Sequence, residues 1–343
     1  MSNLLFNNAL NRVPQKIPPI WFMRQAGRYH SHYQNLKVEY SFEELCKNPE
    51  LSAKTALGPI EDFDFDVSIL FSDILFPLEA LGMGLSYNPG PVFRKFIHPN
   101  NFDELKSVNE AIIDLNFQGD ALKLTREVLP NNKSLIGFIG GPWTVTSYGT
   151  GMNKGVDYKG KLNNDFISKL LIEKIIPLLK KNIELQISSG AEIVMIFDTD
   201  AKSISDSENF NNYSKYLYKE VIKEFPKKIG YYSKSPFDNK FFVDELYSDD
   251  CLLAGLGVDH HLSMDHWFKE INNGFIQGNF NQESMVKDHD EFKKDFDIYV
   301  DHIQSINEKD RAGWVCGLGH GILKDTPEEN VHYFIETIRK IFS

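Results

Sequence analysis

Two arginines four residues apart are the side chains of this sequence best suited to holding an anion. Arg24 and Arg28 lie in the segment Trp21–Tyr29, and they are two of only 7 arginines in a chain with 30 lysines. The rigid guanidinium fork matches carboxylate and phosphate groups, whereas lysine serves as a general cation. Gly27 has no Cβ and allows the backbone to approach a bound group closely. Two exposed arginines after a strand are the simpler interpretation, but the apolar run before Arg24 favours an anion site at the end of a strand.

A carboxylate interrupts the second apolar stretch. Asp73 stands between Ile69–Ser72 and Ile74–Pro77. A carboxylate in such surroundings must be paired, protonated or turned toward a ligand. A helix N-cap or an internal salt bridge explains Asp73 equally well at this stage. Asp198 and Asp200 also follow an apolar run, and for Asp200 solvation in a loop is the favoured interpretation.

A phenol, a hydroxyl and an imidazole complete the candidate set. Tyr148 follows a Gly-Gly-Pro turn after the third apolar run, and Thr199 follows the fourth. His320 lies between two glycines, which leave its imidazole accessible. Aromatic residues near a sheet are more often part of the core, and a lone histidine is usually structural. The flanking glycines make His320 a better site candidate than most histidines.

The sequence lacks the motifs of several common enzyme classes. It contains no phosphate-binding P-loop, no dinucleotide fingerprint after the first strand, no H-E-x-x-H or paired Cys-x-x-Cys, and no G-x-S-x-G elbow. The groups that remain suit an anionic organic substrate that is handled by charge and hydrogen bonds without a cofactor.

Composition restricts the class of protein and its compartment. The formal net charge of −11 argues against a general affinity for nucleic acid or for anionic membranes. No stretch approaches the roughly 20 apolar residues of a membrane span, and the start of the chain lacks the apolar core of a signal peptide. Cys46, Cys251 and Cys316 are too scattered for a disulfide framework. These features predict a cytoplasmic protein.

Eight short apolar runs bounded by Gly, Pro, Asp or Ser predict buried strands. They are Ile20–Met23, Val67–Phe71, Leu135–Ile139, Ile193–Phe197, Ile229–Tyr232, Leu252–Leu256, Phe275–Gln277 and Trp314–Gly317. Helical patterns separate most of them, so the sequence predicts a single α/β domain over residues 1–343, a (β/α)8 TIM barrel. A doubly wound sheet fits the same alternation, but only a barrel brings all the candidate residues that follow the strands to one mouth.

Capping signals predict several of the helices. Ser41 and Glu44 form a capping box, and Pro49 begins a helix that reaches about Phe63. The segment Ile74–Lys133 is expected to be a loop with helices that elaborate one step of the barrel.

Apolar periodicity predicts two further helices. One spans Asp165–Ser189, with Pro177 as a kink and Gly190 as the stop. The other follows a capping box at Thr326–Glu329, with Pro327 at the first helical position, and presents one apolar face.

Several segments together resemble the uroporphyrinogen decarboxylase family. The most specific matches are the block from Met23 to Tyr29 and the block Phe71–Leu75, which continues in Ala80–Met83. The other matching segments are Gly141–Tyr148, Ile196–Thr199, Gly257–Asp259, Gln277–Asn279, Gly317–Ile322 and Thr326–Val331. The resemblance therefore runs nearly from end to end.

This resemblance implies a homodimeric single-domain barrel that removes CO2 from the four acetate side chains of uroporphyrinogen III. The product would be coproporphyrinogen III, in haem biosynthesis, and neither a metal nor an organic cofactor is implied. The catalytic residues would be Asp73, Arg24 and Tyr148. The residues that bind this tetrapyrrole would be Arg24, Gln25, Ala26, Gly27, Arg28, Asp73, Tyr148, Thr199 and His320.

The sequence departs from the family pattern at three places. His260 stands where the family usually has tryptophan after Gly-x-Asp, and Asn281 with Gln282 replaces a usual Asp-Pro. Asp200 stands where bacterial relatives often have tryptophan. These departures put substrate contacts from those loops in question, not the chemistry.

Two other classes compete with this interpretation. Cobalamin- and zinc-dependent methyltransferases share the barrel but carry a His-x-Cys zinc pair near the eighth strand and a further cysteine downstream. Here the matching place has Trp314 and Cys316, and no cysteine follows, so zinc is not expected there. A non-catalytic binding protein would need only the arginines and would leave Asp73 unexplained.

Overall fold

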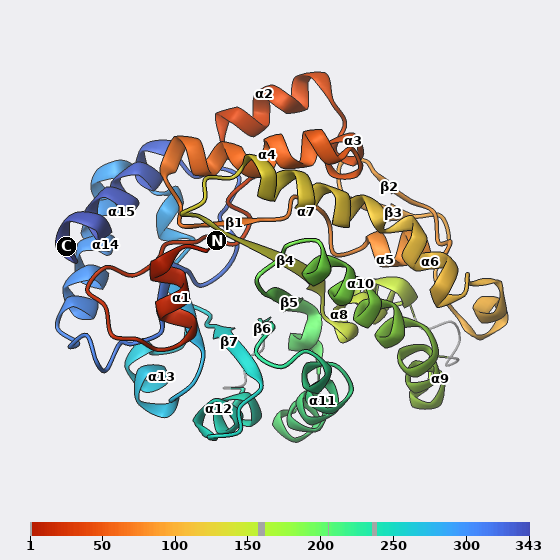
Figure 1. Cartoon of the computed structure of the whole chain (residues 1–343). Coiled ribbons are helices and arrows are strands. Elements are labelled where there is room, and N and C mark those ends of the chain that lie inside the picture. Colours follow the sequence, from red (N-terminus) through yellow and green to blue (C-terminus); the bar gives the residue numbers. More distant parts are fainter. Residues whose placement is uncertain (1, 157–161, 205, 235–238) are drawn as a thin grey trace.

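A curled sheet of seven parallel strands forms the centre of the protein, with helices around its outside (Figure 1). A computed structural model describes residues 2–156, 162–204, 206–234 and 239–343. The strands lie in the order β1-β4-β5-β6-β7-β8-β9. They are β1 (Val67–Ile69), β4 (Ser134–Gly140), β5 (Val194–Asp198), β6 (Ile229–Ser233), β7 (Leu253–Gly257), β8 (Phe275–Phe280) and β9 (Trp314–Leu318). Nearly every strand residue is buried, which confirms an α/β protein with a parallel sheet covered on both faces.

Helices precede the first strand, separate most of the successive strands and follow the last one in the sequence. Those that surround the sheet are α4 (Pro49–Phe63), α7 (Asn116–Val128), α10 (Ile176–Ser188), α11 (Ser207–Glu220), α12 (Lys240–Tyr247), α13 (Met264–Glu270), α14 (His289–Gln304) and α15 (Glu328–Ile341). The shorter α-helices are α1 (Leu4–Leu10), α2 (Ser31–Glu39), α3 (Phe42–Lys47), α5 (Phe76–Ala80), α6 (Val108–Asp114), α8 (Pro142–Thr150) and α9 (Asn164–Leu170). Short 3-10 segments are η1 (Pro99–Glu104), η2 (Met152–Lys154), η5 (Thr199–Ser203), η6 (Ile222–Glu224) and η7 (Ser284–Val286).

The segment 19–21 lies between the two edge strands of the sheet. The Trp21 amide donates to the Cys316 carbonyl of β9 at 3.1 Å, and the Cys316 amide donates to the Pro19 carbonyl at 2.9 Å. On the other side, the amide of Asp66, directly before β1, donates to the Ile20 carbonyl at 3.1 Å. This segment therefore links both edges of the curled sheet.

The expected strand over Ile20–Met23 is wrong beyond a single bridge at Ile20. The chain turns at once, because the Gln25 amide donates to the Phe22 carbonyl at 3.2 Å and Arg24 has a φ of 63°. All four residues of the run are buried. The apolar pattern of this run therefore indicates burial in the core, but it does not indicate pairing in a strand.

Two cores lie on the two sides of the curled sheet. The inner core contains side chains of the strands, of the first segment and of α1, among them Trp21, Met23, Ile136 and Tyr232. The larger outer core fills the space between the sheet and the helices. Burial on both sides fixes which side chains can reach the ends of the strands.

Helix α1 covers the inner core at the amino ends of the strands and lies in front of them in Figure 1. Asn3 caps this helix, and its side chain donates to Oδ1 of Asp66 at 3.1 Å. The Asn3 amide donates to the hydroxyl of Ser134, the first residue of β4, at 3.0 Å. The carboxyl ends of the strands are therefore the end at which a ligand site is expected.

The helix predictions near the start of the chain are confirmed. Ser41 and Glu44 form a reciprocal capping box at α3, and α4 spans Pro49–Phe63 as expected. The segment that follows β1 contains helices but also a two-stranded antiparallel hairpin, β2 (Leu85–Tyr87) and β3 (Pro91–Phe93), which the sequence did not predict.

The two later helices differ from the predictions in detail. The expected long helix is divided into α9 and α10 by a π-helical turn, η4 (Leu171–Ile175), and Pro177 is the second residue of α10. The capping box at Thr326 is wrong: α15 begins at Glu328 with Pro327 as its N-cap, so Thr326 precedes the cap and its buried hydroxyl has no hydrogen-bond partner in the described chain.

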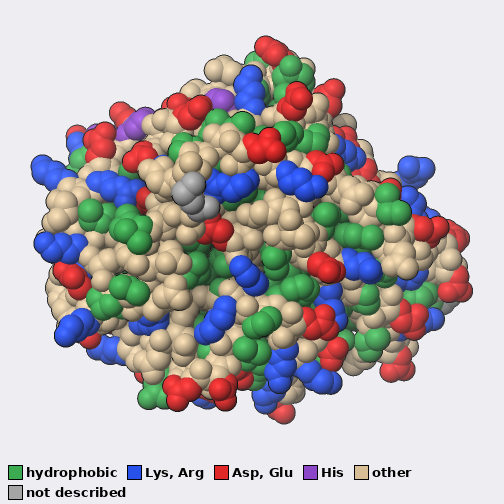
Figure 2. Space-filling model, in the orientation of Figure 1, with side chains coloured by type: hydrophobic (Ala, Val, Ile, Leu, Met, Phe, Trp, Pro, Cys, Tyr) green, Lys and Arg blue, Asp and Glu red, His purple; other side chains and the backbone are tan. Residues whose placement is uncertain are grey.

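Acidic and basic side chains are interspersed on the face shown in Figure 2. Among the described residues, no helix combines the length and the apolar character that crossing a membrane requires.

Candidate active site

Arg24 lies in a strained turn directly after the segment that links the sheet edges. Its φ of 63° is in the left-handed region that residues other than glycine rarely adopt. Such a conformation costs on the order of 1–3 kcal/mol and is typically retained at functional positions. The Ile322 amide donates to the Met23 carbonyl at 3.0 Å and fixes the turn against the segment that follows β9. The Arg24 side chain is exposed at the carboxyl end of the sheet.

The residues between the two arginines shape this turn. Gln25 is 1% exposed; its Nε2 donates to the Val67 carbonyl at 2.9 Å, and its Oε1 accepts from the Phe22 amide at 3.3 Å. A Cβ on Gly27 would lie 2.8 Å from the carbonyl oxygen of Arg24, so the turn itself requires glycine there. Ala26 packs against the outer core. Substrate contacts of Gln25, Ala26 and Gly27 stay predictions.

Asp73 lies between β1 and α5, and it is anchored to the backbone. Its Oδ1 accepts from the Leu75 amide at 2.8 Å. Burial raises the pKa of this carboxyl, while the Leu75 amide, the Tyr87 hydroxyl and the charge of Arg24 act in the opposite direction. The hydrogen bond to the Leu75 amide is the contact expected of a structural aspartate. The same carboxylate is also under the influence of the Arg24 charge at the carboxyl end of the sheet.

Asp198, the last residue of β5, fixes the amino end of α8. Its Oδ1 accepts from the Thr144 amide at 2.9 Å and from the Thr144 hydroxyl at 2.7 Å, and its Oδ2 accepts from the Tyr213 hydroxyl. A Cβ on Gly141 would lie 2.1 Å from Cγ of Asp198, so glycine allows this contact. Because both carboxylate oxygens are used, Asp198 positions the helix.

Tyr148 comes from the same helix, one residue before Gly149. Burial raises the pKa of its phenol; the carboxylates of Asp200 and Asp73 raise it further, and Arg24 lowers it. The phenol thus lies near charged groups from three different loops. It is neutral at physiological pH and can donate a hydrogen bond.

His320 follows β9 and is half-buried. Burial lowers the pKa of its imidazole to about 4, and the positive charges of Arg24 and Lys234 contribute in the same direction. Its ring lies edge-on to that of Tyr232, with 6.1 Å between the centroids and 73° between the planes. The imidazole is therefore neutral at pH 7.

Arg24 is the charge that these side chains share. Its charge partly offsets the burial that raises the pKa values of Asp73, Tyr148 and Tyr232, and it adds to the burial that lowers the pKa of His320. Direct electrostatic effects of this kind require short separations. The structure therefore brings together one arginine, one carboxylate, one phenol and one imidazole that the sequence placed in four separate segments.

The other two predicted residues with functional side chains are Arg28 and Thr199, and neither is among the groups on which Arg24 acts. The exposed Arg28 acts on Tyr33 of α2, whose pKa burial raises to about 12 and Arg28 lowers. Thr199 is half-buried at the start of η5, beside Asp200. Oδ2 of Asp200 is buried without a hydrogen-bond partner in the described part of the chain, which is unusual for a loop carboxylate.

Two tyrosines of the site were missed in the sequence. Tyr87 comes from the unpredicted hairpin, and its hydroxyl acts on Asp73. Tyr232 is the second residue of a Tyr231-Tyr232 pair in β6; Tyr231 belongs to the outer core and Tyr232 to the inner core. Because successive strand residues face opposite sides, that pair was a usable signal, whereas nothing local indicated Tyr87.

The place that corresponds to the methyltransferase zinc pair lies in β9 of the curled sheet. Cys316 is fully buried in β9, and burial raises the pKa of its thiol. The Trp314 indole donates to the Gly278 carbonyl at 3.0 Å. Cys316 belongs to no group of three potential metal ligands within the described ranges.

Comparison with known proteins relates the whole chain to one family. Residues 1–341 match the family described as uroporphyrinogen decarboxylase (URO-D). Uroporphyrinogen decarboxylase from Orientia tsutsugamushi (strain Ikeda) is 32% identical over 348 residues, covering 98% of each chain. That from Francisella tularensis subsp. holarctica (strain OSU18) is 31% identical over 354 residues, also covering 98% of each chain.

A solved structure supports the fold independently of the sequence. A methyltransferase from Methanosarcina mazei superposes with a TM-score of 0.76 over 99% of this chain and 98% of its own, at 18% identity. That identity is too low to transfer an activity, whereas the relatives that match at 31–33% bear a single name. The chain belongs to the uroporphyrinogen decarboxylase family.

Proposed function

We propose that this protein removes CO2 from the four acetate side chains of uroporphyrinogen III and releases coproporphyrinogen III. Membership of the family carries the general activity: the chain is an enzyme that decarboxylates uroporphyrinogen in porphyrin and haem biosynthesis. The finer assignment of roles to residues rests on the geometry of the site.

The observation that carries these roles is the placement of Arg24 beside Asp73 at the carboxyl end of the sheet. The substrate combines acidic side chains with pyrrole N–H groups. A cation that binds carboxylates and a carboxylate that accepts N–H hydrogen bonds are the two partners it needs. Tyr148 and the neutral His320 add hydrogen bonding without adding charge.

The reaction needs a place for the electrons that the departing CO2 leaves behind. Protonation of the pyrrole ring supplies it and makes the ring positive. The Asp73 carboxylate, fixed by the Leu75 amide, stabilises that charge where it develops. Because a guanidinium group does not lose its proton in proteins, Arg24 is a poor proton donor near neutrality. Its role is to position the reacting acetate or a water molecule.

Several properties of the assembly belong to the same proposal. The segment 19–21, hydrogen-bonded to both edges of the sheet, would act as the eighth strand of a closed (β/α)8 barrel. Residues 1–343 would form a single domain that works as a homodimer in the cytoplasm. The decarboxylation itself would use no metal and no organic cofactor.

The test is an anaerobic assay of the purified protein with uroporphyrinogen III, before and after exhaustive chelation. We expect coproporphyrinogen III and four equivalents of CO2, with equal rates in both samples. Activity that disappears with the metal, or methyl transfer in place of CO2 release, would support a methyltransferase. Binding of uroporphyrinogen without turnover would support a non-catalytic binding protein.

A further inference from the structure

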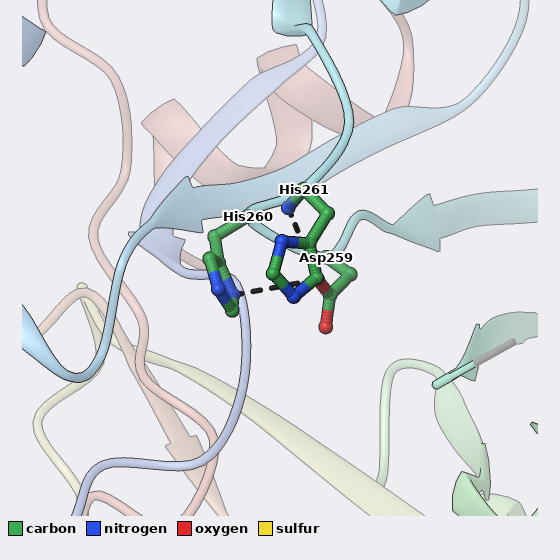
Figure 3. Close-up of side chains that lie close together, drawn as sticks. All are labelled: Asp259, His260 and His261. Carbon is green, nitrogen blue, oxygen red and sulfur yellow. Dashed lines mark hydrogen bonds and ion pairs between the residues drawn. The ribbon is translucent and has the colours of Figure 1, made fainter. Parts of the chain in front are cut away.

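Three consecutive side chains with metal-binding atoms lie together after β7. Asp259, His260 and His261 belong to the loop between β7 and α13, and Figure 3 shows both imidazole rings beside one oxygen of the carboxylate. Each residue offers one ligand atom, and the three atoms lie within 4.8 Å of one another. The proposed decarboxylation does not use this group.

The carboxylate of this group is buried without a permanent counter-charge. Asp259 is 6% exposed. In the described chain its ion-pair partners are only His260 Nδ1, at 3.3 Å from Oδ1, and His261 Nε2, at 3.9 Å. No lysine or arginine of the described ranges lies within ion-pair distance. Buried carboxylates are normally paired with a cation or coordinate a metal, and in the described residues this one has no partner that is permanently charged.

The hydrogen-bonding pattern supports the same conclusion. Oδ1 of Asp259 accepts from the backbone amide of His261 at 3.1 Å, but the buried Oδ2 has no hydrogen-bond partner in the part of the chain that is described. The Tyr232 hydroxyl also interacts with Asp259, but its single proton is shared with the Gly319 carbonyl, which lies 3.0 Å from it. Nδ1 of His260 is likewise buried without a directed hydrogen bond.

The distances suit a single small cation. Ligand atoms about 2.0–2.1 Å from tetrahedral zinc lie roughly 3.4 Å apart, close to the 3.3 Å between Asp259 Oδ1 and His260 Nδ1. His261 Nε2 must approach Asp259 Oδ1 by about half an ångström from its present 3.9 Å, and the largest separation in the group, up to 4.8 Å, must shorten as well. Its side chain is 78% exposed, so it is free to make this movement.

The turn that carries the group is held by other parts of the fold. The Asn279 side chain donates to the Asp259 carbonyl at 3.1 Å and to the Leu262 carbonyl at 2.6 Å, so it holds both ends of the turn. A Cβ on Gly319 would lie 2.3 Å from the backbone nitrogen of His260, so glycine allows the turn to pack against the end of β9. A preorganised loop lowers the cost of binding an ion.

We infer that Asp259, His260 and His261 bind a divalent transition-metal ion of the Zn2+ class, through Asp259 Oδ1, His260 Nδ1 and His261 Nε2. Two imidazole nitrogens and one carboxylate oxygen are a donor set that suits Zn2+, Co2+ and Ni2+, with a fourth position left to water or another ligand. Mg2+ and Ca2+ prefer oxygen donors alone and are excluded. The ion would lie at the edge of the candidate active site, since Asp259 acts electrostatically on His320.

The experiment is a metal titration of the full chain, without a histidine tag and after chelation. Co2+ serves as the spectroscopic probe, because its visible bands report nitrogen ligation, and Zn2+ is titrated by calorimetry. We expect one ion of either metal per chain and no binding of Mg2+ at the concentration that saturates Co2+. Asp259→Asn, His260→Ala and His261→Ala should each weaken binding at least about 10-fold, the smallest loss typical of disturbing a metal site.

A matched control comes from a second histidine–aspartate pair. His302 lies 3.1 Å from Asp265 and offers only two donors, so His302→Ala should leave Co2+ binding unchanged. Circular dichroism verifies the fold of each variant, and the exposed His261 provides the substitution least able to disturb it.

Three outcomes would overturn the inference: no stoichiometric Co2+ bands, unchanged affinity in all three site variants, or loss of the site in His302→Ala. The anaerobic decarboxylase assay on the metal-free protein is independent of this titration. Each proposal can therefore fail alone.

Discussion

Gly321 leaves the space that the Arg24 side chain fills. A Cβ on Gly321 would lie 2.6 Å from Cδ of Arg24 and 3.0 Å from its Nε. The substitution Gly321→Ala should displace the guanidinium by a fraction of an ångström or more while the fold persists. We expect kcat/KM to fall about 10- to 100-fold, as for other misplaced catalytic groups, with little change in Tm.

Gly90 provides the control for this prediction. A Cβ on Gly90 has no heavy atom within 4 Å, and its φ is not positive. Gly90→Ala should therefore leave kcat/KM unchanged. Equal activity of both variants would show that the position of Arg24 does not depend on Gly321.

Arg28→Lys tests whether the fork or only the charge matters. Lysine keeps the positive charge but loses the two parallel N–H donors, so binding of uroporphyrinogen should weaken by about 1–3 kcal/mol. Because Arg28 is exposed, the free energy of unfolding should hardly change. The Kd measured anaerobically decides the matter, and a parental Kd would mean that the interaction is purely coulombic.

Asp73→Asn separates catalysis from folding. The amide keeps an acceptor oxygen but loses the charge that stabilises a protonated pyrrole. We expect kcat to fall at least about 100-fold, with a much smaller change in substrate binding. Asp73→Glu should also be impaired, because the extra methylene displaces the carboxylate. A folded Asp73→Asn protein with parental kcat would leave Asp73 a purely structural role.

The same substitution should change stability in a pH-dependent way. Burial raises the pKa of Asp73 above its value in the unfolded chain, so the folded state holds the proton to higher pH. The ionised carboxylate therefore costs stability, and this cost grows as the pH rises through the folded-state pKa. Asp73→Asn should stabilise the protein more at pH 8 than at pH 4. Urea unfolding at both values measures the difference, and a gain that does not depend on pH would contradict the burial argument.

His320 should make the opposite contribution on the acid side. Its pKa is lowered to about 4 in the folded state from the ordinary value of 6.5. Between these values the unfolded chain binds the proton and the folded chain does not, so stability falls as the pH falls. His320→Gln should reduce the loss of unfolding free energy between pH 7 and pH 5. An identical loss in both proteins would mean that the imidazole is not desolvated.

Local patterns in the sequence were sufficient for the seven strands of the curled sheet. The run Ile229–Tyr232 became β6 almost unchanged, because a short apolar run covered on both faces has few alternatives to a parallel strand. The run Ile20–Met23 does not form the predicted strand, because only the segment 19–21 is hydrogen-bonded to Asp66 and Cys316. These partners are distant in the sequence, so no local pattern shows how far the pairing extends. Burial and strand pairing are separate requirements, and the sequence indicated only the first.

Prediction of the site had a similar limit. Asp73 and His320 could be identified as candidates because each is a polar residue that comes shortly after an apolar strand run. Gln25 was expected to contact substrate, but its amide is occupied by the carbonyl of Val67 and the amide of Phe22. A sequence motif indicates that a residue is required, but it does not show whether its side chain contacts a ligand or stabilises the backbone. Tyr87 was missed because its hairpin is placed beside Asp73 by tertiary packing alone.

The link between segment 19–21 and β9 sets an order for assembly during synthesis. Arg24 follows a segment whose partner in β9, Cys316, is synthesised long after it. The nascent chain can form the hydrogen bond between Asp66 and Ile20 early, but the hydrogen bonds to Cys316 must wait for β9 and then close a very long loop. A partly synthesised chain has the arginine but no fixed place for it. If Arg24 binds the tetrapyrrole as proposed, affinity for it would require β9 to be in place.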